Sequence, residues 1–202
     1  MLKKATQDND RHLLLVDDDR LVLITMANAL RQVGYHVTTT ESVDEAESWL
    51  AEGHHQPHLV ILDIQMPGGC GLSFAQRLRE LDRIPFIILS AYSDEETVAQ
   101  ATQQGALGYA VKPLEPLQLV PIIKTALVQA DRLQELGILR RQLQHALDSE
   151  RDINVAVGIT MMQRRLTRAA AFDLLRQSAR TQQCKLNQLA GSIIDAAETL
   201  NL

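Results

Sequence analysis

The chain has 202 residues, 22% of them charged and 46% apolar, which is room for one large domain or two small ones with a buried core. Its net charge of −5 argues against a protein coated all over with nucleic acid or anionic lipid, and two widely spaced cysteines exclude a disulfide framework. We expect a cytoplasmic protein, because the start of the chain lacks the apolar core of a secretory signal and no stretch approaches the length of a membrane span.

Five short apolar segments predict the strands of a first module. They are rich in Val, Ile, Leu or Thr, are bounded by polar or turn residues, and span His12–Val16, Tyr35–Thr39, Leu59–Leu62, Phe86–Leu89 and Gly108–Val111. Segments that are apolar at nearly every position are typical of strands buried on both faces, as in a parallel sheet.

Segments with helical spacing lie between these strands. They cover residues 20–33, 42–50, 72–81 and a stretch from Ser93 to just before Gly105. Gly34 predicts a C-terminal cap, and Ser42 with Glu45 and Ser93 with Glu96 predict capping boxes. The alternation predicts the α/β class, with a doubly wound five-stranded parallel sheet over residues 11–115 that follows a flexible N-terminal segment, residues 1–10.

Polar side chains follow the predicted strands at their carboxyl ends, where doubly wound folds bind ligands. These residues are Asp17, Asp18, Asp63, Ser90 and Lys112. Carboxylates packed together repel each other and need a cation, and hard oxygen ligands with open positions suit Mg²⁺. A carboxylate beside Mg²⁺ and a lysine can attack phosphorus and give an acyl phosphate. The next residue, Asp19, is expected only to stabilise the N-terminus of the following helix.

These segments resemble, in order, the receiver domain of two-component response regulators. The match covers roughly residues 11–115 and rests on Leu-Val-Asp-Asp-Asp at 15–19, Leu-Asp-Ile-Gln-Met-Pro at 62–67, Ser-Ala at 90–91 and Lys-Pro at 112–113. A flavodoxin-like fold is implied. Gly71 matches the turn glycine that follows the phosphoacceptor strand in that family.

The resemblance also implies roles for individual residues. Asp63 would be the phosphoacceptor and, with Asp17, Asp18 and the backbone carbonyl of Gln65, would hold Mg²⁺. The switch residues would be Ser90, Tyr109 and Lys112. A sensor histidine kinase would be the partner that supplies the phosphoryl group.

A long helix is predicted over residues 116–150. Pro116 suits a first helical turn, whereas Pro121 predicts a slight kink or a later start. Seven of ten heptad positions are apolar, and the ten are Leu119, Ile122, Ala126, Gln129, Leu133, Leu136, Arg140, Leu143, Leu147 and Glu150. This spacing favours a coiled-coil seam. The alternative, a helix that merely covers the sheet, is expected only up to about Leu127, so we expect a homodimer through residues 128–150.

Residues 151–202 predict a small domain of three helices. Breaks are expected near Arg165–Thr167 and Thr181–Lys185, with Thr167 as an N-cap. This segment holds 7 Lys and Arg against 4 Asp and Glu, whereas residues 1–114 hold 9 against 16. The candidate phosphate contacts, outside the apolar face, are Arg164, Arg165, Arg168, Arg176 and Arg180. The domain is too small for an independent catalytic site, so we do not expect an enzyme.

Small and apolar residues of this tail have a characteristic order: Ala156, Gly158, Met161, Leu166, Thr167, Ala171, Phe172, Leu175, Arg176, Ala179, Leu186 and Ala190. They resemble the ANTAR domain, the RNA-binding output of transcription antitermination regulators, although close packing in any helical bundle would also select small residues. The resemblance implies binding to structured RNA, and the positive charge of this segment predicts that the five arginines contact it. Val157 stands where that family usually has Lys, which predicts altered RNA preference or weaker binding. Phe172 is expected to be buried, with stacking on an RNA base as the alternative.

The favoured function is therefore a phosphorylation-controlled response regulator that binds structured RNA hairpins and acts as a transcription antiterminator. A DNA-binding output, whose dimer would read paired half-sites, is the first alternative. A dimeric signalling module that binds other proteins is the second.

Overall fold

The computed structural model defines residues 11–53, 56–67, 69–91 and 95–200. The N-terminal segment 1–10 and the predicted cap at Ser93 lie outside this range. The chain divides into two compact units, Met1–Leu133 and Gln134–Leu202. Within the described ranges no helix is both long and apolar enough to span a bilayer.

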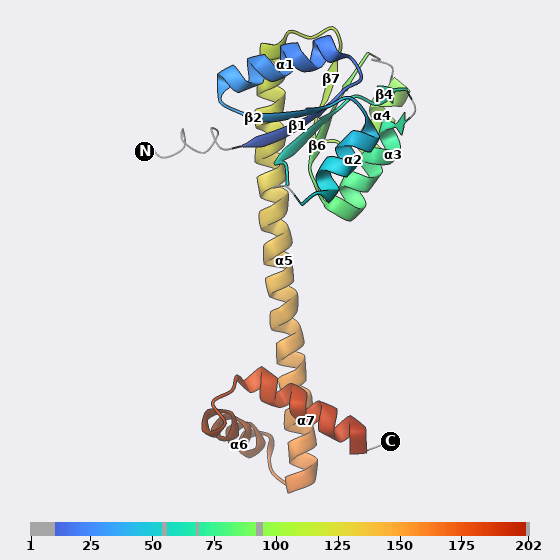
Figure 1. Cartoon of the computed structure of the whole chain (residues 1–202). Helices are drawn as coiled ribbons and strands as arrows, with labels where there is room; N and C mark the ends of the chain where they lie inside the picture. The colour runs from blue at the N-terminus through green and yellow to red at the C-terminus, as the bar shows by residue number, and fades with distance from the viewer. Residues whose placement is uncertain (1–10, 54–55, 68, 92–94, 201–202) are drawn as a thin grey trace. The chain divides into compact units, whose positions relative to one another are not determined.

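A five-stranded parallel sheet forms the centre of the first unit (Figure 1). Its strands are β1 (His12–Val16), β2 (His36–Thr40), β3 (Leu59–Leu62), β6 (Phe86–Ser90) and β7 (Tyr109–Val111), in the spatial order β2-β1-β3-β6-β7. This order confirms the predicted doubly wound α/β class. The second strand begins one residue later than predicted, and the last begins at Tyr109 rather than Gly108.

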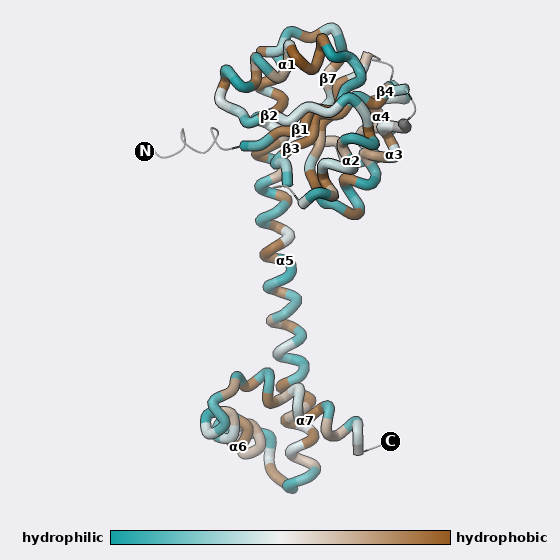
Figure 2. Tube along the Cα trace, in the orientation of Figure 1, coloured by the Kyte–Doolittle hydropathy of each residue, from teal (hydrophilic) through white to brown (hydrophobic). Residues whose placement is uncertain are grey.

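Helices cover both faces of the sheet and bury two apolar clusters (Figure 1). On one face, α1 (Arg20–Val33) and the first turns of α5 (Pro116–Arg164) pack on alternate strand residues such as Leu13 and Leu15. The other face is covered by α2 (Val43–Ala51), α3 (Gly71–Arg77) and α4 (Glu95–Gln103). Figure 2 shows β1 as strongly hydrophobic and the edge strand β2 as much paler. Burial on both faces explains why β1, β3 and β6 are apolar at nearly every position, whereas the edge strand β2 is partly exposed and mostly threonine.

Helix ends in the first unit follow the predicted capping residues in part. Asp19 is the N-cap of α1, and its carboxylate accepts from the N–H groups of Leu21 and Val22. Gly34 ends α1 in the left-handed region with φ 108°. At α2, Ser42 accepts from the Glu45 N–H, but the Glu45 carboxylate accepts from Glu41 N–H instead of the Ser42 N–H of a complete capping box.

Two local features depart from the predicted elements. The helix expected over residues 72–81 begins at Gly71 and widens into a π-helical turn, η2 (Leu78–Asp82), where the N–H groups of Arg83 and Ile84 both donate to the carbonyl of Leu78. A short antiparallel pair, β4 (Gln65–Met66) and β5 (Gly69–Cys70), lies between β3 and α3.

Helix α5 is continuous from Pro116 to Arg164, so it extends beyond residue 150, where the predicted linker ended. Its buried residues against the sheet end at Leu127, as expected, and Val128 is exposed. An ion pair of 2.6 Å between Arg11 Nη2 and Asp131 Oδ2 joins the start of β1 to this part of α5.

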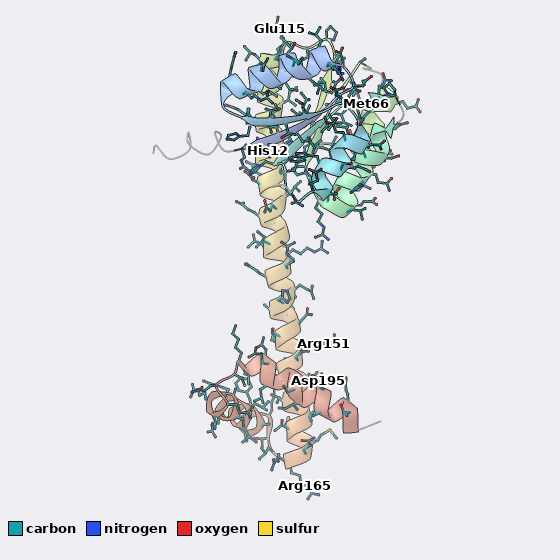
Figure 3. The ribbon with its side chains drawn as sticks, in the orientation of Figure 1. His12, Met66, Glu115, Arg151, Arg165 and Asp195 are labelled. Carbon is teal, nitrogen blue, oxygen red and sulfur yellow. The ribbon has the colours of Figure 1, made fainter. Side chains whose placement is uncertain are left out.

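The second unit is a bundle of the last turns of α5, α6 (Arg168–Thr181) and α7 (Leu186–Leu200), which confirms the predicted three-helix domain. Its core consists of Ala156, Val157, Ala171, Leu175, Ala179, Leu189 and Ala190. Thr167 is the N-cap of α6, as predicted. Arg165, labelled in Figure 3, has a positive φ of 51° at the turn that follows α5.

Candidate functional site

Three carboxylates meet at the carboxyl edge of the sheet. One ligand oxygen each from Asp17, Asp18 and Asp63 lies within 4.8 Å of the others. Asp17 and Asp63 are buried, whereas Asp18 is exposed to solvent. The structure thus brings together the three acidic residues that the strand-end pattern selected.

Backbone hydrogen bonds between neighbouring strands hold Asp17 and Asp63 in place. The Asp17 N–H donates to the Thr40 carbonyl at 3.2 Å, and the Asp63 N–H donates to the Val16 carbonyl at 2.9 Å. Both residues therefore directly continue a strand, and their side chains share one edge of the sheet.

Two further backbone N–H groups orient the carboxylates. The Asp19 N–H donates to Asp17 Oδ1 at 3.0 Å, and the Gln65 N–H donates to Asp63 Oδ1 at 2.8 Å. The sequence did not single out these donors, because almost every residue carries a backbone N–H and only the folded turn aims one at a carboxylate. Figure 3 labels Met66, which follows Gln65 in β4.

The Lys112 ammonium lies between the two buried carboxylates. Its Nζ is 2.5 Å from Asp63 Oδ2 and 2.6 Å from Asp17 Oδ2. The contact with Asp63 is a hydrogen bond, whereas the contact with Asp17 is an ion pair without hydrogen-bond alignment. The peptide bond between Lys112 and Pro113 is cis. Lys112, directly after β7, thus supplies the cation that partly balances the negative charge of the acidic cluster.

The pKa values of this cluster reflect burial and charge together. Burial raises the pKa of the Asp17 carboxyl above its usual value, and the nearby charge of Asp63 raises it further. The Lys112 ammonium and the Asp19 N–H act in the opposite direction without cancelling this effect. Burial lowers the pKa of Lys112, but its close contacts with the Asp17 and Asp63 carboxylates and their charges outweigh this and leave the pKa raised. An additional cation would therefore relieve the buried Asp17 charge.

Gly71 allows the chain to pass close behind the acidic cluster. A Cβ atom at this position would lie 2.5 Å from Ile64 Cα and 2.8 Å from the Asp63 carbonyl oxygen. Both distances are shorter than any ordinary contact, and both atoms belong to the backbone. Only glycine therefore fits here, as the sequence resemblance implied.

Ser90 and Tyr109 lie on the strands next to the cluster. Ser90 ends β6 and is fully buried, and its carbonyl accepts from the Lys112 N–H at 2.8 Å. Tyr109 begins β7, and its half-buried side chain packs against the apolar core on the face of the sheet that α2, α3 and α4 cover. Ser90 and Tyr109 thus lie on adjacent strands, with Tyr109 opposite Ile88, and Lys112 directly follows β7.

The donor set fits Mg²⁺. Its ligands would be the carboxylate oxygens of Asp17, Asp18 and Asp63, which are hard donors in one cluster. The exposed Asp18 leaves one side of the site accessible to solvent, which suits an ion that keeps several of its waters.

All five candidate arginines of the second unit are exposed: Arg164, Arg165, Arg168, Arg176 and Arg180. Arg168 donates to Asn154 Oδ1 at 3.1 Å. Within the described ranges, none of the five forms an ion pair with a carboxylate.

Two hydrophobic positions of this unit differ from their expected environment. The prediction that Phe172 is buried is wrong, because the side chain is 37% exposed and lies outside the core. The core next to it is filled by Ala171, Leu175 and Ala179. Val157 is only 3% exposed, so this side chain packs inside the bundle rather than on its charged surface.

The comparison with known protein families matches both units. A family model described as the response regulator receiver domain matches residues 13–124, and one described as the ANTAR domain matches residues 141–194. The receiver match spans more than half of the chain. The chain therefore belongs to the response regulators that carry a receiver domain followed by an ANTAR domain, and both are regulatory modules.

Individual relatives agree with this assignment. The transcriptional regulatory protein PdtaR of Mycobacterium tuberculosis is 27% identical over 192 residues, which cover 94% of this chain and 92% of that protein. AfsQ1 of Streptomyces coelicolor, also a transcriptional regulatory protein, is 32% identical over 120 residues, or 59% of this chain and 52% of that protein.

Solved structures match the first unit. A response regulator from Thermotoga maritima has a TM-score of 0.53 and 26% identity and covers 59% of this chain and 98% of that chain. A CheY-like receiver domain from Methanospirillum hungatei, at 24% identity and a TM-score of 0.55, shares the fold over 60% of this chain and 97% of that chain.

Proposed function

We propose that the chain is a phosphorylation-controlled response regulator that binds structured RNA hairpins and acts as a transcription antiterminator. The observation that carries this proposal is the presence, in one chain, of a Lys112-bridged acidic cluster on a receiver sheet and an ANTAR match over residues 141–194. PdtaR, which matches both units, is a transcriptional regulatory protein, and this supports control of transcription. The chain acts in the cytoplasm, where a sensor histidine kinase supplies the phosphoryl group.

Asp63 is the phosphoacceptor in this proposal. A carboxylate oxygen attacks the phosphorus of the donor, an acyl phosphate forms, and the donor's leaving group departs with the electron pair of the broken bond. The Gln65 N–H and Lys112 Nζ hold the two Asp63 oxygens, so the carboxylate is oriented before the donor arrives. Asp17, Asp18, Asp63 and the Gln65 carbonyl would hold Mg²⁺, which would supply positive charge for the phosphoryl oxygens.

Ser90, Lys112 and Tyr109 then report the phosphorylation. Lys112 already contacts Asp63 Oδ2, so its ammonium pairs with the phosphoryl oxygens without a long movement. The Ser90 hydroxyl, at the buried end of β6, donates to the phosphoryl group, and the Tyr109 ring turns further inward.

Phosphate labelling tests the receiver half of the proposal. A small phosphodonor with Mg²⁺ should add one phosphoryl group to the chain, and the Asp63→Asn variant should remain unlabelled in intact-mass measurements. Labelling should also fail with a chelator, because the carboxylates then repel the anionic donor. Asp44→Asn, at an exposed position on α2, is the matched control and should label normally. Full labelling of Asp63→Asn would reject this assignment.

The arginines of the second unit provide the attraction to RNA phosphates. Arg176 and Arg180 lie one helical turn apart on α6 and are free of ion pairs within the described part of the chain, so both are available for successive phosphates. Val157 is buried in the bundle, so its side chain does not contribute to this surface, and we still expect altered RNA preference or weaker binding from the missing Lys. A homodimer through residues 128–150 presents two such surfaces, and paired hairpins on one transcript bind more tightly than one.

The proposed RNA binding of the second unit is tested by titration. The phosphorylated chain is titrated against single hairpins, paired hairpins and duplex DNA. Affinity for RNA should fall with salt, and Arg176→Ala or Arg180→Ala should each lower the log–log salt slope by roughly 0.7 to 0.9. Gln177→Ala, exposed on the same helix, is the matched control. Equal affinity for duplex DNA, or no change in the arginine variants, would favour a DNA-binding output. Binding to neither nucleic acid would favour the protein-binding module.

A further inference from the structure

Phe172 is an aromatic side chain that the fold does not use for its core. It lies on α6 between Ala171 and Leu175 in sequence, and both of these are buried, yet its own side chain is 37% exposed. The core of the bundle next to Phe172 is formed by small side chains such as Ala171 and Ala179. Removing the ring therefore costs little core packing. The exposed part of the ring is available for contact with a binding partner.

The surroundings of Phe172 are basic. Arg168 and Arg176 lie four residues before and after it, so all three side chains share one face of α6. Neither arginine forms an ion pair with any carboxylate of the described residues. The single acidic residue of α6, Asp173, is the next residue along the helix. An anionic partner with an aromatic or flat apolar group matches this combination.

Single-stranded RNA has this chemistry. Unpaired loop bases stack on exposed aromatic rings, while phosphates on either side bind arginine. A protein partner would have to cover the ring and also bring carboxylates to two arginines, whereas one splayed nucleotide supplies both features. The charge of the second unit, with 7 Lys and Arg against 4 Asp and Glu after residue 150, agrees with a polyanion.

We propose that Phe172 is the stacking platform for one unpaired base of the RNA loop, with Arg168 and Arg176 on the flanking phosphates. This inference rests on the proposed RNA-binding function and adds to it a residue that recognises the loop rather than the stem. The arginines supply affinity for any phosphate backbone, whereas the ring requires a base that can leave its stack.

The test uses the full-length chain with Mg²⁺ and a small phosphodonor. The RNA probe is a hairpin selected from a pool with one constant stem and a randomised loop. Phe172→Leu keeps an apolar side chain and removes the ring, and Phe172→Tyr keeps the ring. Leu174→Ala is the matched control, because Leu174 is 38% exposed on the same helix but points away from the Phe172 face. Circular dichroism melting of each variant reports its folding.

Phe172→Leu should bind the hairpin roughly five- to hundredfold more weakly, the range expected for one stacked base, with unchanged melting. Phe172→Tyr and Leu174→Ala should bind as the wild type does. An abasic nucleotide at the stacked loop position should weaken wild-type binding by the same factor, and should cause no further loss with Phe172→Leu.

Other results would show whether only the stacking role of Phe172 is wrong or whether the proposed RNA-binding function is wrong as well. If Phe172→Leu binds like the wild type while Arg176→Ala binds more weakly, the chain binds RNA but the stacking role is wrong. If Phe172→Leu weakens binding equally for intact and abasic hairpins, the ring contacts another protein surface and the stacking role is again wrong. If the wild type binds no selected hairpin more tightly than duplex DNA, the proposed function is wrong and this inference falls with it.

Discussion

Asp17 shows how a single buried charge prepares the receiver for a cation. Its side chain is buried at the end of β1, between Lys112 and Asp63, and burial keeps its pKa above the usual value despite the ammonium. The ionised form is therefore less favourable in the folded chain than in the unfolded chain. Ionisation of Asp17 lowers the stability of the metal-free protein as pH rises from the ordinary aspartate pKa through the raised one.

We predict that Asp17→Asn stabilises the metal-free receiver at neutral pH. The variant removes the buried charge, so its urea midpoint should exceed that of the wild type above the raised pKa of Asp17, and the difference should disappear in acid, where both side chains are neutral. Urea unfolding in a chelator across a pH series measures this. Asp44→Asn, on the exposed side of α2, should follow the wild type at every pH. An Asp17→Asn variant less stable than the wild type at neutral pH would contradict this account.

The acidic site could be predicted from sequence more completely than the RNA surface. Carboxyl ends of parallel strands meet at one edge, so residues that follow apolar segments must converge there, as Asp17, Asp63 and Lys112 do. The environment of Phe172 was predicted wrongly because the expectation of burial followed from the aromatic that the resembling family keeps beside Ala171. The helical wheel instead places Phe172 between Arg168 and Arg176, outside the core of Ala171, Leu175 and Ala179.

At the scale of elements, the strands were predictable and the short connections were not. Strands such as β3 are apolar throughout because helices cover both faces of the sheet. Each strand of the β4–β5 pair has only two residues, which is too short for any periodic signal. The π-turn after α3 keeps helical spacing of apolar residues, so the pattern does not distinguish it from an ordinary turn.

Helix α5 changes its environment along its length. Leu119 and Leu127 are buried under the sheet, whereas the seam leucines Leu133, Leu136, Leu143 and Leu147 are each more than half exposed. A row of exposed leucines at heptad spacing is typical of a helix that pairs with another helix. This apolar row supports the proposed homodimer through residues 128–150.

We predict that Leu136→Asp together with Leu143→Asp converts the chain from a dimer to a monomer. The two carboxylates would enter an apolar seam with no partner, at a cost of several kcal/mol in that interface. Light scattering of the full chain measures the change in mass. The matched control is Ile138→Asp, which places the same charge at an exposed position of α5 on the side opposite the seam, and it should remain dimeric. A dimeric double variant would show that the main interface lies elsewhere.

At the scale of the whole molecule, two units of opposite charge divide the work. The first unit is acidic and holds the carboxylate cluster at which we propose phosphorylation, whereas the second unit is basic and carries the proposed RNA contacts. Only α5 runs continuously from one unit to the other, from Pro116 to Arg164. In the proposed function, control of RNA binding by the receiver therefore acts through this helix and the homodimer proposed for residues 128–150.

The most direct test of this account is the affinity of one full-length chain for paired RNA hairpins, measured with and without a small phosphodonor in Mg²⁺. We expect the phosphodonor to tighten binding of the wild type and to leave the affinity of Asp63→Asn unchanged. The Leu136→Asp, Leu143→Asp variant should lose the preference for paired over single hairpins. Identical affinity of the wild type with and without phosphodonor, after labelling of Asp63 has been verified by mass, would contradict phosphorylation control of RNA binding.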